Sequence, residues 1–465
     1  MIDGKAWDWE TGQKKIPMAD WRGRFGWVEE PYVSLDGEKV AAIVNTGEEA
    51  FNVCVNGDTW ESDYDKIWHL RFLPDGCLSA LVSEQGEWTV ALDGSSWENL
   101  FGYVWNPLYS RYNGHMAVAV QQDMRYCMAL DGKPWNQTYA NITYFALSDC
   151  GTKTAGAVQV VDADSGEIHK FKQGTFTAAL QGKAWDTTFV NVWNLTISPD
   201  GEHLAAEVRQ SLYDYTIAVD GRTWDSLYTC VWEPVFHPAK HHVVAPVRVG
   251  GHWLLAQDGE ILWDRPFVQL WHQMFSPDGD RIAAVVAPEY GRWTVAIDGL
   301  PWKRSFKDMV TDAVFSPNGK RVGALAKEGR NWYVVTDGIP WSNTFDMAWQ
   351  PVFSPDGEHV AAKIEKNGKF AVALDDHLGP HICDAAWDPI FSPKGDKILL
   401  RSIEDNTYYR RVVPVGEFAR KRGDHEGLLW IVDRSIGLGG VLHFHRRQIV
   451  SPGSDADSRT KEGKS

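Results

Sequence analysis

The sequence has few of the features that mark membrane-spanning or metal-cluster proteins. Its longest apolar region, 428–442, is interrupted by Asp433 and Arg434, so no stretch reaches the ~18 apolar residues of a transmembrane helix. The six cysteines include no Cys-x-x-Cys pair, which argues against a local iron–sulfur or zinc cluster and against c-type haem attachment. No basic segment followed by an apolar run opens the chain, and we therefore expect free thiols in a reducing cytoplasm.

Positive charge and catalytic motifs are also scarce. The chain has 46 Lys and Arg against 62 Asp and Glu, a formal charge of −16. Nucleic acids and anionic membrane surfaces both require a basic footprint, so neither is expected as a partner. The sequence contains no Gly-x-Ser-x-Gly motif, no P-loop and no dinucleotide-binding glycine motif in its strand–helix context. We therefore predict no catalytic and no cofactor-binding residues.

Tryptophan, in contrast, is abundant, with 24 in 465 residues. When the chain is aligned with itself at a step of about 39 residues, 20 of them fall in three repeat positions. The first position follows an Asp-Gly pair and holds Trp7, Trp60, Trp97, Trp135, Trp185, Trp224, Trp263, Trp302 and Trp341. The second lies five residues before a Ser-Pro-Asp-Gly type turn and holds Trp68, Trp105, Trp193, Trp232, Trp271, Trp349 and Trp387. The third lies five residues before the Asp-Gly pair and holds Trp88, Trp253, Trp293 and Trp332, with Phe or Tyr in other copies.

The turn motif defines the repeat. Good copies begin at Ser198, Ser276 and Ser354, and degenerate copies at Ser34, Leu73, Ser110, Ser148, His237, Ser316 and Ser392. Proline presets φ at the first central position of a turn, and glycine supplies the positive φ that follows. Each turn precedes an apolar run, an alternating strand and an Asp-Gly turn, without helical periodicity. This pattern predicts an all-β protein, a β-propeller of about ten four-stranded blades.

The order of the motifs predicts how the ring closes. The chain opens with an Asp-Gly-x-x-Trp unit at 3–7, and its last strand, 408–415, has no such unit after it. The N-terminal strand is therefore expected to complete the last blade, which removes an exposed sheet edge. We expect a propeller over 1–416, with an insertion at 10–27 and a long hairpin at 158–173, and a partly disordered tail at 417–465. Because ten blades exceed the usual range of about 4–8, two smaller rings stay an alternative.

Two roles are open to the tryptophans. Those in the first position are expected to pack between blades. Those in the second position are expected near the rim of one face, where an aromatic side chain either packs or anchors a partner. The predicted partner-binding residues are the second-position tryptophans and three outside the repeat, namely Trp68, Trp105, Trp193, Trp232, Trp271, Trp349, Trp387, Trp21, Trp27 and Trp430. The clustered His237, His241 and His242 are expected to be solvated loop residues, so no metal site is predicted.

The turn followed by an apolar strand resembles the WD40-like repeats of the TolB type. In tryptophan content, size and repeat type, the whole chain is similar to the TmcD subunits of the transmembrane electron-transfer complex of sulfate-reducing bacteria. That resemblance implies an accessory subunit without a redox centre, on the cytoplasmic side and peripheral to the inner membrane through its complex. The implied partners are a periplasmic multihaem cytochrome, a membrane cytochrome b and a cytoplasmic iron–sulfur subunit.

These observations favour a non-catalytic scaffold in a respiratory redox complex over an enzyme. Two alternatives remain open. One is a propeller enzyme such as a quinoprotein dehydrogenase, a class that also carries a repeated Trp motif but is usually exported and binds calcium with its quinone. The other is a sensor or interaction propeller unrelated to respiration.

Overall fold

The computed structural model describes residues 4–161 and 168–419. The chain divides into two compact units, Met1–Arg422 and Gly423–Ser465. The second unit lies outside the described residues, as does nearly all of the tail predicted for 417–465. Of that tail only the end of a short helix, α3 (Val415–Ala419), is described.

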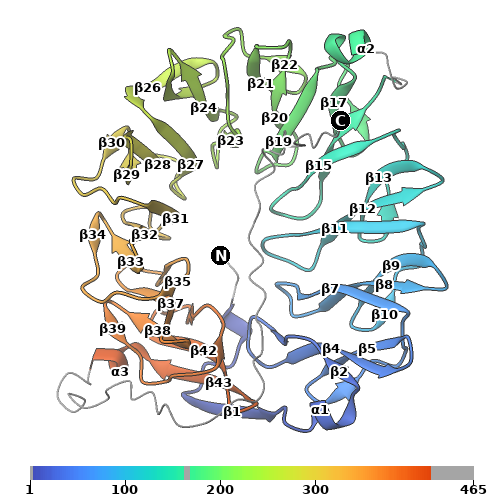
Figure 1. Ribbon diagram of the computed structural model, residues 1–465, viewed down its shortest axis with the longest axis vertical. Coiled ribbons are helices and arrows are strands. Elements are labelled where there is room, and N and C mark those ends of the chain that lie inside the picture. The colour runs from blue at the N-terminus through green and yellow to red at the C-terminus, as the bar shows by residue number, and fades with distance from the viewer. Residues whose placement is uncertain (1–3, 162–167, 420–465) are drawn as a thin grey trace, which may run out of the picture. The chain divides into compact units, whose positions relative to one another are not determined.

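Within the first unit, the described residues form ten antiparallel sheets. The sheets follow one another around a single ring in chain order, and each is one blade of a β-propeller (Figure 1). The predicted all-β class and the predicted ten blades are confirmed. None of the helices in the described ranges has the length and apolar character that crossing a bilayer requires.

Blades are numbered here along the chain. Blade 1 holds β2 (Trp27–Val28), β3 (Tyr32–Val33), β4 (Val40–Gly47), β5 (Ala50–Val55) and β6 (Asp58–Thr59), and blade 2 holds β7 (Lys66–Phe72), β8 (Leu78–Glu84), β9 (Glu87–Leu92) and β10 (Ser95–Ser96). Blade 3 holds β11 (Tyr103–Tyr109), β12 (Met116–Gln122), β13 (Arg125–Leu130) and β14 (Lys133–Pro134), and blade 4 holds β15 (Ile142–Leu147), β16 (Thr154–Gln159), β17 (Phe176–Leu180) and β18 (Lys183–Ala184). Blade 5 holds β19 (Asn191–Ile197), β20 (Leu204–Arg209), β21 (Tyr215–Val219) and β22 (Arg222–Thr223).

The second half of the ring continues in the same way. Blade 6 holds β23 (Val235–Phe236), β24 (Val243–Val249), β25 (His252–Gln257) and β26 (Glu260–Phe267), and blade 7 holds β27 (Gln269–Phe275), β28 (Ile282–Glu289), β29 (Arg292–Ile297) and β30 (Leu300–Pro301). Blade 8 holds β31 (Met309–Phe315), β32 (Val322–Glu328), β33 (Asn331–Thr336) and β34 (Ile339–Pro340), and blade 9 holds β35 (Met347–Ala348), β36 (Val352–Phe353), β37 (Val360–Lys366), β38 (Lys369–Leu374) and β39 (His377–Leu378). Blade 10 holds β40 (Ala385–Ala386), β41 (Ile390–Phe391), β42 (Lys397–Glu404), β43 (Thr407–Pro414) and β1 (Gly12–Pro17).

Successive antiparallel strands place each blade's connections on two opposite faces. The Ser-Pro-Asp-Gly type turn joins the first and second strands, and the Asp-Gly turn joins the third and fourth. Both turns lie at the same end of the blade, which we call the turn face. The hairpins between the second and third strands lie at the other end, the hairpin face. The first strand is nearest the centre of the ring in blades 2, 5, 7 and 8, where β7, β19, β27 and β31 are labelled in Figure 1.

The N-terminal strand closes the ring, as the sequence predicted, but a different segment supplies it. β1 pairs antiparallel with β43, from Gly12 opposite Val412 to Pro17 opposite Thr407. Residues near Trp7, expected to form that strand, instead form a short 3-10 helix, η1 (Gly4–Ala6). The closing strand therefore lies inside the predicted insertion 10–27, together with a helical turn, α1 (Trp21–Arg24). β1 reads Gly-Gln-Lys-Lys-Ile-Pro and is almost wholly exposed, so it carries no apolar alternation that could mark it as a strand.

The long hairpin predicted at 158–173 is also different in the structure. β16 ends at Gln159, and a short helix, α2 (Ile168–Gln173), precedes β17. Residues 162–167 lie outside the described part of the chain. Ile168 and Phe171 are three residues apart, a spacing that puts both on one side of a helix. The insertion therefore contains a helical turn where two extended strands were expected.

The core lies between the blades. Second strands such as β8 and β28 are buried almost from end to end, because a neighbouring blade covers each face of the sheet. First-position tryptophans fill the space between blades, as predicted: the ring of Trp60 lies under Gly94 in the Asp-Gly turn of the next blade. The same contact joins Trp97 to Gly132, Trp135 to Gly182, Trp185 to Gly221, Trp224 to Gly259, Trp263 to Gly299 and Trp302 to Gly338.

Candidate functional site

Second- and third-position aromatic residues form pairs within most blades. A second-position tryptophan lies in the first strand or close to one of its ends, and its partner lies on the third strand, so the two rings meet across the strand between them. The ring centroids are 4.5 Å apart in Trp68–Trp88, 4.7 Å in Trp271–Trp293, 5.3 Å in Trp232–Trp253, 5.6 Å in Trp349–Phe370, 6.1 Å in Trp387–Tyr408 and 6.2 Å in Trp193–Tyr215. Most second-position tryptophans are therefore packing residues of their own blade, although Trp232 is still exposed.

Two such pairs continue into the next blade: the Trp105–Tyr126 pair, in which Trp105 lies 6.1 Å from Phe145 of blade 4, and the Trp68–Trp88 pair. Tyr103, the first residue of β11, lies 5.6 Å from Trp88 and 6.5 Å from Trp68 of blade 2. It also stacks on Trp105 of its own blade, with centroids 5.9 Å apart and an angle of 23° between the ring planes. Trp105 in turn meets the edge of Tyr126 at 6.0 Å. We call Trp68, Trp88, Tyr103, Trp105 and Tyr126 the aromatic surface.

The aromatic surface is partly open to solvent and borders a cavity. Trp68 is 42% exposed and Tyr103 is 40% exposed. Tyr103, Trp105 and Tyr126, with Gln121, line a cavity of about 380 Å³, within the ~300–1,000 Å³ range of small-molecule pockets. Its walls are three aromatic rings and a single amide, so it suits an apolar or aromatic group that makes one polar contact. A second cavity, of about 350 Å³, lies at the turn face between blades 3 and 4 and includes Trp135, Thr154 and Gln181 in its lining.

The predicted partner-binding residues outside the repeat have different surroundings. Trp21 is buried in α1 and packs in a cluster with Tyr408. Its prediction as a surface anchor is therefore wrong, because α1 folds this side chain inward over blade 1. Trp27 is exposed on β2, with its ring edge-on to Phe51. Trp430 lies outside the described residues.

Sequence reasoning missed Tyr103. The three repeat positions account for its neighbours Trp68, Trp88 and Trp105, but Tyr103 does not belong to any of them. The corresponding residue is Trp27 in blade 1, but Lys66, Asn191, Gln269 and Met309 in blades 2, 5, 7 and 8. An aromatic residue at a position that is polar or aliphatic in most of these copies was the available signal.

Sequence reasoning also missed Glu207 on β20, whose carboxyl group is buried. Its side chain accepts a hydrogen bond from Asn194 Nδ2 at Oε2, 2.8 Å away. Burial raises the pKa of Glu207 to about 7, because the charged form loses its hydration in the interior of the blade. The neighbouring Glu233 adds to the same upward shift of the pKa.

The clustered histidines have three different environments. His237 is buried, and its Nδ1 accepts hydrogen bonds from the backbone N–H groups of Ala239 and Lys240. Burial lowers the pKa of His237, so the expectation of a solvated ring is wrong for this residue, because the degenerate turn folds it under the next blade. His242 pairs through Nδ1 with the carboxylate of Asp258 at 2.6 Å. His241 is exposed and faces blade 5.

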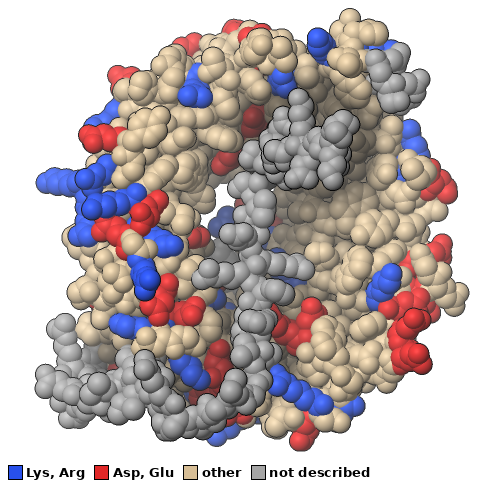
Figure 2. All heavy atoms as spheres, viewed as in Figure 1, with Lys and Arg blue, Asp and Glu red and all other residues tan. Residues whose placement is uncertain are grey.

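His242 belongs to a series of histidine–carboxylate and arginine–carboxylate pairs at the turn face. In each pair, the side chain just before the second strand reaches the aspartate of the Asp-Gly turn. The histidine pairs, each 2.6 Å long, are His115–Asp131, His203–Asp220, His242–Asp258 and His359–Asp375. Arginine takes the same position in Arg281–Asp298 and Arg321–Asp337. Figure 2 shows acidic and basic side chains interspersed around the rim of the face in view.

Searches by sequence found no matching protein family and no matching curated protein. Comparison with solved structures gave matches of low identity. A crystal structure of the eukaryotic initiation factor is 11% identical over 70% of this chain and 90% of that chain, with a TM-score of 0.46. The β-propeller domain of Cps50 (Swd1) from Myceliophteria thermophila is 14% identical over 58% and 96% of the two chains, with a TM-score of 0.28. The putative TolB from Agrobacterium tumefaciens is 17% identical over 39% and 73%, with a TM-score of 0.24.

The fold thus has β-propeller and TolB-like neighbours. At these identities and scores the matches carry no argument about function. The resemblance to TmcD subunits stays a prediction.

Proposed function

We propose that the chain is a non-catalytic interaction scaffold and that its aromatic surface binds a partner protein. The observation that carries this proposal is the continuation of the Trp68–Trp88 pair into blade 3 through Tyr103. The repeat explains paired rings inside most blades, but it does not explain Tyr103, which joins the pair of blade 2 to that of blade 3.

The chemistry of the aromatic surface supports this role. Tryptophan and tyrosine are enriched among the residues that contribute most to protein–protein binding, since each buries a large apolar area at a small cost in conformational entropy. Trp68 and Tyr103 are exposed, and Tyr103 lines a cavity that an apolar side chain of a partner can enter. The net charge of −16 disfavours nucleic acid as the occupant.

We further propose that this partner belongs to a membrane-associated respiratory redox complex, in which the chain is an accessory subunit on the cytoplasmic side. The support is the similarity to TmcD subunits in tryptophan content, size and repeat type. The complex then contains a cytochrome b, an iron–sulfur subunit and a multihaem cytochrome, and the membrane contact of this chain is made through them.

Purification from the detergent-solubilised membranes of its native cells tests both proposals. The wild-type chain should migrate with subunits that show haem absorption and an iron–sulfur signal in electron paramagnetic resonance. Trp68→Ala/Tyr103→Ala should reduce the co-migrating haem at least about tenfold, since each loss of 1.4 kcal/mol in binding is a factor of ten.

Trp232→Ala is the matched control. Trp232 is also an exposed second-position tryptophan stacked on a third-position partner, but its pair stays within blade 6. The control should retain the complex. Migration of the wild-type chain without haem or iron–sulfur subunits would refute the redox complex. An equal loss in the control would refute the aromatic surface as the binding site.

A further inference from the structure

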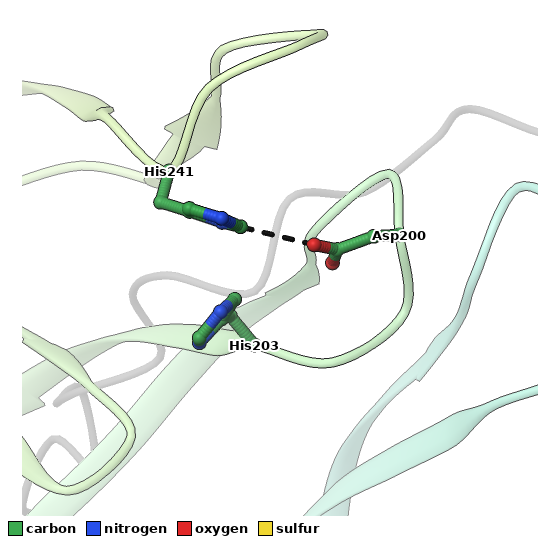
Figure 3. A group of neighbouring side chains, drawn as sticks. All are labelled: Asp200, His203 and His241. Carbon is green, nitrogen blue, oxygen red and sulfur yellow. Dashed lines mark ion pairs between the residues drawn. The ribbon is translucent and has the colours of Figure 1, made fainter.

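Three polar side chains from two neighbouring blades meet at the turn face. Asp200 and His203 belong to the turn between β19 and β20 of blade 5, and His241 belongs to the turn between β23 and β24 of blade 6. Each offers one ligand atom, and the three atoms lie within 4.8 Å of one another. In Figure 3 the His241 ring points at the Asp200 carboxylate across the gap between the two turns, and His203 lies beside both.

The contacts within this group are close. His241 Nδ1 is 3.7 Å from Asp200 Oδ2. The His203 and His241 rings have centroids 4.5 Å apart and planes at 68°, so the rings meet edge to face and do not stack. Side chains of His241 and Asp200 are largely exposed, which leaves them room for a small rotation.

The blade 5 turn holds the Asp200 carboxylate in place. Its Oδ1 accepts hydrogen bonds from the Ser198 hydroxyl and, at 3.1 Å, from the backbone N–H of Glu202. With Oδ1 occupied by the turn, Oδ2 is the oxygen directed at His241. One ligand is thus fixed by the same hydrogen bonds that form the Ser-Pro-Asp-Gly turn.

His203 is held from its other side. Its Nδ1 is 2.6 Å from Asp220 Oδ2. When Nδ1 donates its proton to that carboxylate, Nε2 keeps a lone pair that is available to a metal. A carboxylate behind a metal-binding imidazole is the usual arrangement in proteins, where it fixes the orientation and tautomer of the ring.

The ligand set selects the class of metal. Two imidazoles with one carboxylate suit zinc and its neighbours among the divalent transition metals, whereas calcium and magnesium prefer oxygen ligands alone. Three protein ligands leave a fourth position for water in a tetrahedral site. Ligand atoms around a tetrahedral zinc are about 3.3 Å apart, given bonds of ~2.0–2.1 Å, so the two turns need to approach only slightly.

The same turns in other blades lack this combination. In blade 9, Asp356 and His359 repeat the first two residues, and His359 pairs with Asp375 at 2.6 Å. The position that corresponds to His241 is Asp396 in blade 10. The cluster therefore depends on the degenerate turn of blade 6, which carries Lys240 and His241 where a good copy has Gly and an acidic residue.

We propose that Asp200, His203 and His241 form a binding site for one divalent transition metal ion of the zinc class, which links blade 5 to blade 6. The sequence predicted no metal site because the ligands lie on two separate turns, about 40 residues apart, and only the fold brings them together.

Metal binding to the untagged, full-length protein tests this proposal. Isothermal titration of the metal-free chain with Zn²⁺ should show one equivalent bound at these turns. Co²⁺ should give the visible absorption bands of a tetrahedral site. His203→Ala/His241→Ala should weaken this binding by at least about 100-fold, since even the loss of an outer hydrogen-bond partner costs about 10- to 100-fold.

Two control variants locate the ion. His359→Ala removes the equivalent histidine of blade 9 and should leave the binding unchanged. His443→Ala/His445→Ala removes histidines of the C-terminal tail and should also leave one equivalent bound. Circular dichroism of the metal-free variants should match the wild type, because His203, His241 and His359 lie on turns at the turn face.

Zinc should also raise the melting temperature of the wild type and of both controls, but not that of His203→Ala/His241→Ala. Absence of stoichiometric Zn²⁺ binding by the wild type would overturn the proposal. Unchanged affinity in His203→Ala/His241→Ala, or loss of the binding in His359→Ala, would overturn it equally.

Discussion

Glu207 shows how a single side chain makes the stability of the blade depend on pH. It is 7% exposed, and burial raises its pKa from an ordinary value of 4.5 to about 7. Between these two pH values the folded protein holds a proton that the unfolded chain has released. The contribution of Glu207 to stability is therefore complete below pH 4.5 and is lost as the pH rises through 7.

Glu207→Gln should raise the free energy of unfolding at pH 8 by on the order of 3 kcal/mol. The amide stays neutral at every pH, and its oxygen can still accept the hydrogen bond of Asn194. At pH 4, where the glutamate is protonated, the variant and the wild type should be equally stable. Urea unfolding at both values checks this, and a gain of the same size at pH 4 would contradict a carboxyl group that ionises near 7.

At the scale of the element, the glycine of the Asp-Gly turn both adopts a positive φ and leaves room for a tryptophan of the preceding blade. Gly94 has φ +85°, which a residue with a Cβ rarely adopts, and a Cβ there would lie 3.0 Å from Trp60 Cγ in the preceding blade. Gly86, in the hairpin between β8 and β9, has nearly the same φ of +84° and nothing within 4 Å of that point. Substitutions at these two glycines therefore distinguish the cost of the backbone conformation from the cost of overpacking between blades.

Gly86→Ala should cost about 1–2 kcal/mol of stability, the conformational penalty alone. Gly94→Ala should cost about 1–3 kcal/mol more, because the added methyl group also overpacks the contact with Trp60. Denaturant unfolding of the two variants measures the difference. Equal costs would mean that the tryptophan does not require glycine in the turn above it.

The sequence predicted best the elements that recur in every repeat. Each blade carries its own turn and its own tryptophans, so the same pattern can be recognised ten times along the chain. β1 was misplaced because Gly12–Pro17 is polar and exposed and pairs with a strand at the other end of the chain. Local periodicity has no information about such a pairing. The contact of His241 with Asp200 was not predicted for a similar reason, since it depends on how neighbouring blades pack against each other.

For the whole ring, the weak point is the junction between the N-terminal part of the chain, which includes β1 and blade 1, and the C-terminal strands β42 and β43, because no turn connects β1 to β43 and the two sides meet only through non-covalent contacts. Three side chains of blade 10 cross this junction: Arg401, Tyr408 and Arg410 donate hydrogen bonds of 2.8–2.9 Å to carbonyl groups of the blade 1 turn at 34–38. Arg410 also donates to the carbonyl oxygen of Asp8. These contacts hold both the first blade and the N-terminal segment against the last blade.

Arg410→Ala should cost about 2–3 kcal/mol of stability. Its side chain is 3% exposed and donates to the carbonyl groups of Asp36 and Asp8, so truncation leaves these partly buried acceptors without their donor. Arg321→Ala is the control. That arginine is 33% exposed and bridges blades 8 and 9, which the chain already connects. We expect its substitution to lower the free energy of unfolding by about 1 kcal/mol. Thermal and denaturant unfolding compare the two, and equal losses would refute a special role for the junction.

The pairing of β1 with β43 also has a consequence during synthesis. β1 is made first, and its partner follows about 400 residues later. At ~5–20 residues per second the ribosome needs about 20–80 s to make that stretch. Blades 1 to 9 can each form from contiguous chain as it emerges, but blade 10 needs both ends. A polypeptide that stops short of β43 therefore keeps its first strand without a partner and blade 10 incomplete, and an open sheet edge of this kind can pair with another chain.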